Sequence, residues 1–151
     1  MIIAKVRGGL GNQLFIYAAA RALALDRKTE MALDLSEYEE YSRRTFILPH
    51  LCGQKQEADP ADIARLKKIA PHDFPSRWMR RINLMLGLGQ PVYYRQPGYA
   101  FDRRFLLIGP EAYLDGLFQS EKFFAHRAGE IRKGIFPVSY THLTLPTIYS
   151  V

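Results

Sequence analysis

The sequence predicts an α/β fold built on a parallel sheet, because three kinds of segment follow one another near its start. "IIAKV" at residues 2–6 is a short β-branched run, typical of a buried strand. After a glycine turn, "LFIYAAARALAL" at residues 14–25 has strong helix formers and one charge, which indicates a helix packed on most sides. "EMALDLS" at residues 30–36 predicts a second strand. Strand, turn, helix and strand make a βαβ unit, so a Rossmann-like parallel sheet follows.

The later segments continue this alternation of strands and helices. Asp59 and Pro60 are expected to cap and begin a helix, since aspartate and proline favour these two positions. Further strands are predicted at residues 91–96 and 112–119. A helix is predicted from Ser120 to Phe136, with the serine as its cap.

Composition and length fit one soluble domain. The chain has 151 residues, of which 48% are hydrophobic and 24% charged, an ordinary balance for a compact core. No apolar run reaches the roughly 18 to 20 residues of a membrane span, and no signal-peptide pattern stands at the start, so we expect a cytoplasmic protein. Cys52 is the single cysteine and is expected to be buried. No Asp-x-Asp pair and no His/Cys cluster with metal-ligand spacing occurs in the sequence.

Basic charge is concentrated in one part of the chain. Residues 65–104 carry nine Lys and Arg against two Asp and Glu, within a net charge of +6. Such a patch attracts acidic lipid, nucleic acid or a phosphorylated small substrate, or is a solvated face with no partner. The segment 76–89 has an amphipathic pattern with arginines largely on one side, which suits peripheral contact with an acidic membrane. A non-enzymatic binding module is one rival hypothesis, although we expect no nucleic-acid partner.

The turn between the first strand and helix is the candidate ligand site. A turn at this place brings backbone N–H groups and the positive end of a helix to the carboxyl edge of a sheet, which favours phosphate. Gly8, Gly9 and Gly11 can reach positive φ and leave room for a ligand, or can simply make a tight turn. Asn12 and Gln13 can exchange hydrogen bonds with phosphate and sugar hydroxyls, although Asn12 also suits a helix cap. Phosphate and sugar together suggest a nucleotide sugar.

A nicotinamide or flavin dinucleotide is the alternative ligand for this turn. "GLGNQL" matches the first two glycines of the dinucleotide fingerprint, and Asp34 ends the second strand where a ribose-binding acid belongs. The third small residue of the fingerprint is absent, because Leu14 stands there. A P-loop is excluded, since no Gly-Lys-Ser or Gly-Lys-Thr follows.

Two segments resemble a known enzyme family. "RGGLGNQLFIYAAARALA" at residues 7–24 and "YLDGLFQSEKFF" at residues 113–124 are similar to the N-terminal signatures of glycosyltransferase family 11, the α-1,2-fucosyltransferases. The resemblance extends over residues 1–136, with a poorly matched middle. It implies an inverting, metal-independent transfer of L-fucose from GDP-fucose to the 2-hydroxyl of a terminal β-galactoside, on a GT-B-type pair of Rossmann-like domains. The residues expected to bind substrate are Gly8, Gly9, Gly11, Asn12, Gln13 and Gln119.

The resemblance also predicts what this chain lacks. Family members carry a His-x-Arg-Arg-x-Asp motif, whose arginine is taken to hold the GDP phosphates, and none of the three Arg-Arg pairs here follows His-x. Asp115 is a conceivable general base, but strand-ending aspartates more often serve turns or caps, so the catalytic residues stay unassigned. Residues 138–151 resemble a translated adaptor or vector sequence. We therefore expect residues 1–137 to be the N-terminal domain of a truncated enzyme with a non-native tail, inactive alone.

Overall fold

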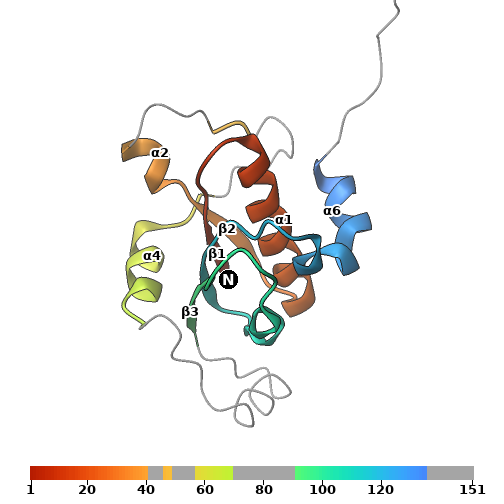
Figure 1. The fold of residues 1–151 in the computed structure, drawn as a ribbon. Helices are drawn as coiled ribbons and strands as arrows, with labels where there is room; N and C mark the ends of the chain where they lie inside the picture. The colour runs from red at the N-terminus through yellow and green to blue at the C-terminus, as the bar shows by residue number, and fades with distance from the viewer. Residues whose placement is uncertain (41–45, 49–56, 70–90, 136–151) are drawn as a thin grey trace, which may run out of the picture.

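A computed structural model describes four parts of the chain, residues 1–40, 46–48, 57–69 and 91–135. These parts form three layers, with a parallel sheet between helices (Figure 1). Three sequence predictions lie outside the described residues: the buried Cys52, the amphipathic helix at 76–89 and the tail at 138–151. The division of the chain at residue 137 stays a prediction.

The sheet has four described strands in the order β2-β1-β4-β3. They are β1 (Ile2–Lys5), β2 (Met31–Asp34), β3 (Val92–Arg95) and β4 (Ala112–Asp115). All neighbouring strands are parallel, so all four end at the same edge of the sheet. The parallel α/β arrangement confirms the predicted Rossmann-like fold, with strands a little shorter than the patterns suggested.

Helices cover both faces of the sheet. Helix α1 (Leu10–Arg27) packs on one face together with α6 (Ala128–Ile135), and α4 (Pro60–Lys67) packs on the other (Figure 1). Alternate strand residues supply the two cores, as the pleat requires. Ile2 and Ala4 lie in the larger core beneath α1, and Ile3 lies in the smaller core beneath α4.

Helix α1 begins four residues earlier than its apolar pattern predicted. Gly9 is its N-cap residue and makes no side-chain cap bond, so the second half of the glycine turn is already helical. Its alanine-rich middle is buried, which confirms a helix packed on most sides. The helix ends at Arg27, and its C-cap residue Lys28 has a left-handed backbone (φ 51°) and bonds through its N–H to the carbonyls of Ala24 and Leu25.

The two predicted caps have different outcomes. Asp59 Oδ1 accepts a hydrogen bond of 2.7 Å from the Ala61 N–H, and Pro60 begins α4, which confirms the first cap. The helix predicted from Ser120 is wrong in its first half. Two single 3-10 turns, Glu121–Phe123 and Ala125–Arg127, precede α6, and Ser120 makes no side-chain cap bond. The tighter turns rotate the aromatic residues.

The two phenylalanines of this segment differ in burial. Phe123 is fully buried, whereas Phe124 is half-buried and meets Phe15 of α1 edge to face, with ring centroids 5.9 Å apart. Ile131 and Ile135 are the buried residues of α6. The segment after β4 therefore packs on α1. The second motif, residues 113–124, runs from β4 past the carboxyl edge of the sheet into this segment.

Candidate functional site

The two motifs singled out in the sequence meet at the carboxyl edge of the sheet. Asn12, in the first turn of α1, accepts a hydrogen bond of 2.8 Å through its side-chain oxygen from Gln119 Nε2. Gln119 follows β4, the strand beside β1, so the bond joins segments more than a hundred residues apart in sequence. The sequence order of the strands also reverses between β1 and β4, the place where open α/β sheets bind ligands.

The three glycines of the turn have different reasons to be glycine. Gly8 has φ 80°, and a Cβ there would lie 2.4 Å from Asn12 Nδ2, so the fold itself requires glycine. Gly9 and Gly11 are exposed, and an added Cβ would meet no atom of the described structure within 4 Å. Protein packing therefore explains the first glycine and leaves open space in front of the other two.

The start of α1 offers backbone donors beside these glycines that have no partner among the described residues. The first intrahelical bond runs from the Gln13 N–H to the Gly9 carbonyl, at 3.1 Å. The N–H groups of the three preceding helical residues point out of the helix end and carry its positive dipole. This geometry suits a phosphate oxygen, as the glycine turn predicted.

The Gln13 side chain is buried and bonded to backbone groups of the protein, so it does not face the open space at the helix start. Its side chain is fully buried, and its Nε2 donates to the Gly8 carbonyl at 3.2 Å. Its Oε1 accepts from the backbone N–H groups of Ile47 and Leu48, at 3.1 and 3.3 Å. Tyr38 O–H donates to the same Gly8 carbonyl at 2.6 Å. The ligand role predicted for Gln13 stays untested, and its geometry favours fastening the turn to residues 46–48.

Asn12 and Gln119 are the more accessible amides. Asn12 is half-buried and Gln119 is exposed. The cap residue of α1 is Gly9, so the interpretation of Asn12 as a helix cap is wrong. Their mutual bond uses one acceptor and one donor, and the Asn12 Nδ2 and Gln119 Oε1 groups have no hydrogen-bond partner among the described residues. Both can therefore bind a ligand at the helix start.

Asp34 does not serve as an accessible ribose acceptor. It is fully buried, accepting bonds from Tyr113 O–H at 2.6 Å, the Ser36 N–H at 3.0 Å and Lys67 Nζ at 3.1 Å. Burial alone would raise the pKa of this carboxyl, but these hydrogen bonds outweigh burial and hold the pKa below its ordinary value. The dinucleotide alternative therefore loses the acid on which it depended.

A second aspartate gathers a polar cluster that the sequence did not predict. Asp115 ends β4 and lies 3.3 Å from Arg7 and 3.4 Å from Arg95, and Tyr93 O–H donates to it at 3.1 Å. Arg7, Gln96 and Gly116 line a cavity of about 270 Å³ at this edge. The signal was present in the sequence, because a polar residue follows each apolar strand run.

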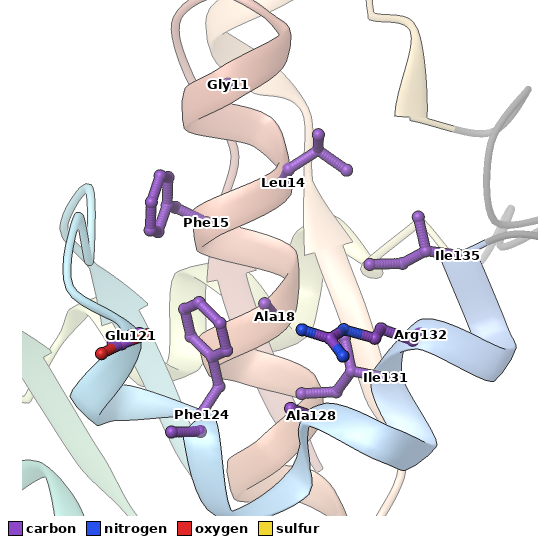
Figure 2. Close-up of a pocket in the computed structure, with 11 residues that line it drawn as sticks. Gly11, Leu14, Phe15, Ala18, Glu121, Phe124, Ala128, Ile131, Arg132 and Ile135 are labelled. Atoms are coloured by element: carbon purple, nitrogen blue, oxygen red, sulfur yellow. The ribbon is translucent and has the colours of Figure 1, made fainter.

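An apolar groove lies on the other side of the helix start. Leu14, Phe15 and Ala18 of α1 face Phe124 and the apolar side of α6 across a cavity of about 340 Å³ (Figure 2). Gly11 lies at one end, and Arg132 is the one basic residue in its lining. The groove suits apolar surface, and its chemistry is unlike that of the polar cavity.

The described residues bring together no group of three or more His, Cys, Asp or Glu side chains that could hold a metal ion. Within the same residues, no helix is both long and apolar enough to cross a membrane. Metal independence and membrane contact both stay predictions.

Comparison with known proteins gives one partial similarity. Over 42 residues the chain is 40% identical to an alpha-1,2-colitosyltransferase of Escherichia coli, which is a glycosyltransferase. The matched stretch is 28% of this chain and 14% of that enzyme, so the chain spans a small part of its relative. No protein-family model matches the chain, and no solved structure matches it.

Proposed function

We propose that this chain is part of an inverting α-1,2-fucosyltransferase that uses GDP-fucose as its donor and a terminal β-galactoside as its acceptor. The observation that carries the proposal is the open helix start at Gly9 and Gly11, where Asn12 and Gln119 stand together. Backbone donors there suit a diphosphate, and the amides suit sugar hydroxyls. The partial similarity to a glycosyltransferase supports the reaction class, and the resemblance to family 11 suggests the sugar and linkage.

The chain's own residues supply binding and orientation in this mechanism. The free N–H groups at the start of α1 hold a phosphate oxygen while the bond between sugar and diphosphate breaks, and their dipole stabilises the charge on the leaving group. Asn12 and Gln119 orient the sugar beside it. The His-x-Arg-Arg-x-Asp motif of the resembled family is absent from this sequence, so binding rather than turnover is the measurement we choose.

The proposal is tested by closing the open space at the helix start. Gly11→Ala adds one methyl group where the protein has room, so the fold should be as stable as before or more stable, by up to about 1 kcal/mol. The methyl group blocks the approach of a phosphate, and we expect GDP-fucose affinity in calorimetric titration to fall at least about tenfold.

Gly129→Ala is the matched control. Gly129 lies in α6, and an added Cβ there also meets no atom within 4 Å. This variant should bind GDP-fucose like the unmodified chain. Unchanged affinity in Gly11→Ala, or no GDP-fucose binding by the unmodified chain, would reject the proposed donor site.

A colitosyl donor is the second candidate, and the partial similarity favours it. The similar enzyme is named for colitose, whereas the family resemblance points to fucose. Competition at the same site between the nucleotide-activated forms of the two sugars decides between them. The tighter binder identifies the donor sugar, and the Gly11→Ala variant should weaken both.

A further inference from the structure

We propose that the cavity lined by Arg7, Gln96 and Tyr99 binds one sugar ring through its hydroxyl groups. The inference rests on the proposed function, because it assigns a place to a sugar of that reaction. The cavity lies at the carboxyl ends of β4 and β3, and the Arg7 that lines it precedes the glycine turn directly. A ligand there would therefore lie next to a phosphate held at the start of α1.

The first observation is a pair of buried polar atoms without hydrogen-bond partners. Gln96 Nε2 and Asp115 Oδ1 are both buried and make no hydrogen bond in the described structure, although Asp115 Oδ1 is ion-paired with Arg7 Nη1 at 3.3 Å. Gln96 Oε1, by contrast, accepts from the backbone N–H groups of Leu117 and Phe118, at 3.0 and 2.9 Å. The side chain is thus held firmly with its amide nitrogen unused. Gln96 lines the cavity, and Asp115 contacts Arg7, which also lines it. Buried polar atoms are almost always bonded, so this pair calls for a ligand.

The second observation is that the backbone makes room for this arrangement. A Cβ at Gly116 would lie 2.6 Å from Gln96 Cβ and 2.7 Å from Gln96 Oε1. Glycine after Asp115 therefore lets the Gln96 side chain cross the end of β4 and form a wall of the cavity. Glycine at position 116 is therefore required by the packing of Gln96, and this packing forms the cavity wall.

The chemistry of the two atoms selects a hydroxyl-bearing ligand. One atom is a donor and the other is an anionic acceptor. A phosphate could accept from Gln96 and from Arg7, but the Asp115 carboxylate would repel it. An ammonium group could donate to Asp115, but Arg7 and Arg95, both within 3.4 Å of that carboxylate, would repel it. A sugar hydroxyl both donates and accepts, so it satisfies both atoms.

The size and the exposed wall of the cavity agree with a single sugar ring. Its volume of about 270 Å³ falls just below the roughly 300 to 1,000 Å³ of pockets for drug-sized ligands, which suits a monosaccharide unit rather than a nucleotide. Tyr99 lines it and is 75% exposed, an unusual position for a large aromatic side chain. Its ring offers a flat apolar surface for the C–H face of a sugar.

Binding includes a small side-chain movement. Both unbonded atoms are covered in this structure, and Arg7, which lines the cavity, contacts Asp115 Oδ1 at 3.3 Å. The Arg7 side chain is one third exposed, so it can turn outward at low cost and let a hydroxyl reach the carboxylate. Asp115 already accepts a hydrogen bond from Tyr93 and is ion-paired with two guanidinium groups, which stabilise its ionised form. We therefore assign it to binding a hydroxyl and not to removing its proton.

The experiment follows the side-chain amide signal of Gln96 by NMR, assigned from its loss in Gln96→Leu. Methyl β-galactoside at millimolar concentration is the acceptor probe, GDP-fucose is the donor probe, and GDP and inorganic phosphate are the controls. A shift with the galactoside identifies the acceptor sugar as the occupant. A shift with GDP-fucose that GDP does not cause identifies the donor sugar. Either result supports the inference.

Variants of Tyr99 provide the matched comparison, because the side chain is exposed and its replacement should not affect folding. Tyr99→Ala should weaken, about tenfold, the binding of whichever sugar shifts the Gln96 signal, and Tyr99→Phe should retain that binding. Leu106→Ala changes another exposed apolar residue and should leave the sugar affinity unchanged. The inference is overturned if no sugar shifts the Gln96 signal, if GDP or phosphate shifts it as much, or if Tyr99→Ala binds normally. Gly11→Ala separates the two proposals, since it weakens GDP-fucose and leaves the galactoside unaffected.

Discussion

Two aspartates occupy matching positions in the sheet and have opposite surroundings. Asp34 ends β2 and Asp115 ends β4, each after a leucine, on the two strands that flank β1. Asp34 is fully buried, with Tyr113 and Lys67 donating to its side chain. Asp115 is 8% exposed and keeps one oxygen without a hydrogen bond. At the same edge of the sheet, the aspartate of β2 accepts hydrogen bonds on both carboxylate oxygens, whereas the aspartate of β4 accepts one on a single oxygen.

The difference follows from what lies over each carboxylate. Lys67 at the end of α4 reaches Asp34, and the fully buried Tyr113 completes its bonds from within the protein. Asp115 is reached instead by Arg7 and Arg95, two partly exposed side chains, of which Arg7 lines the polar cavity. A helix over a strand end makes an aspartate structural, whereas an open strand end leaves it available to a ligand.

The largest expected effect is a difference in how much the protein loses in stability when each aspartate is replaced by asparagine. Asp34→Asn places an amide donor against Tyr113, Lys67 and the Ser36 N–H, and we expect it to lower the free energy of unfolding by about 3 kcal/mol. Asp115→Asn should cost about 1 kcal/mol, because its guanidinium partners are screened by solvent. Urea unfolding of both variants measures the contrast. Equal losses would remove the distinction between a structural and an available carboxylate.

The next effect concerns the tyrosines that donate to the two carboxylates. Burial, followed by the bond to Asp34, raises the pKa of Tyr113 far above its usual value, so its hydroxyl remains a donor at any ordinary pH. Tyr113→Phe leaves a buried charge short of one donor and should cost about 2 kcal/mol. Tyr93→Phe should cost about 0.5 kcal/mol, since Asp115 retains two arginines at the surface. Thermal unfolding in one buffer compares the pair.

Local patterns allowed the fold and the glycine turn to be predicted. The βαβ unit followed from segments close in sequence, and the Asp59 cap depends on neighbouring residues alone. The failed cap at Ser120 shows the limit of such patterns, because packing of Phe123 into the core selects 3-10 turns there. Gln13 shows a second limit, since its partners Ile47 and Leu48 are more than thirty residues away.

The polar cavity could not be predicted for the same reason. Its two walls come from the ends of β3 and β4, and only the pairing of these strands brings Gln96 over Gly116. In sequence, Gln96 is one polar residue after an apolar run and Arg7 is another. A rule that examines the last residue of each parallel strand and the first polar residue after it would have included both, together with Asp34 and Asp115.

The smallest expected effect is on the acid dependence of stability. Burial raises the pKa of Asp34, and its hydrogen bonds lower the pKa by more than burial raises it. The net lowering of the pKa is therefore only the difference between two opposite effects. A pKa below the unfolded value of about 3.9 contributes stability above that pH, and this contribution disappears as the pH falls through the lowered folded-state value. Asp34→Asn removes it, so urea midpoints measured from pH 7 down to about pH 2 should fall less steeply in the variant than in the unmodified chain. Parallel curves would mean that the bonds to Asp34 do not favour its ionised form, and the contrast with Asp115 would then rest on burial alone.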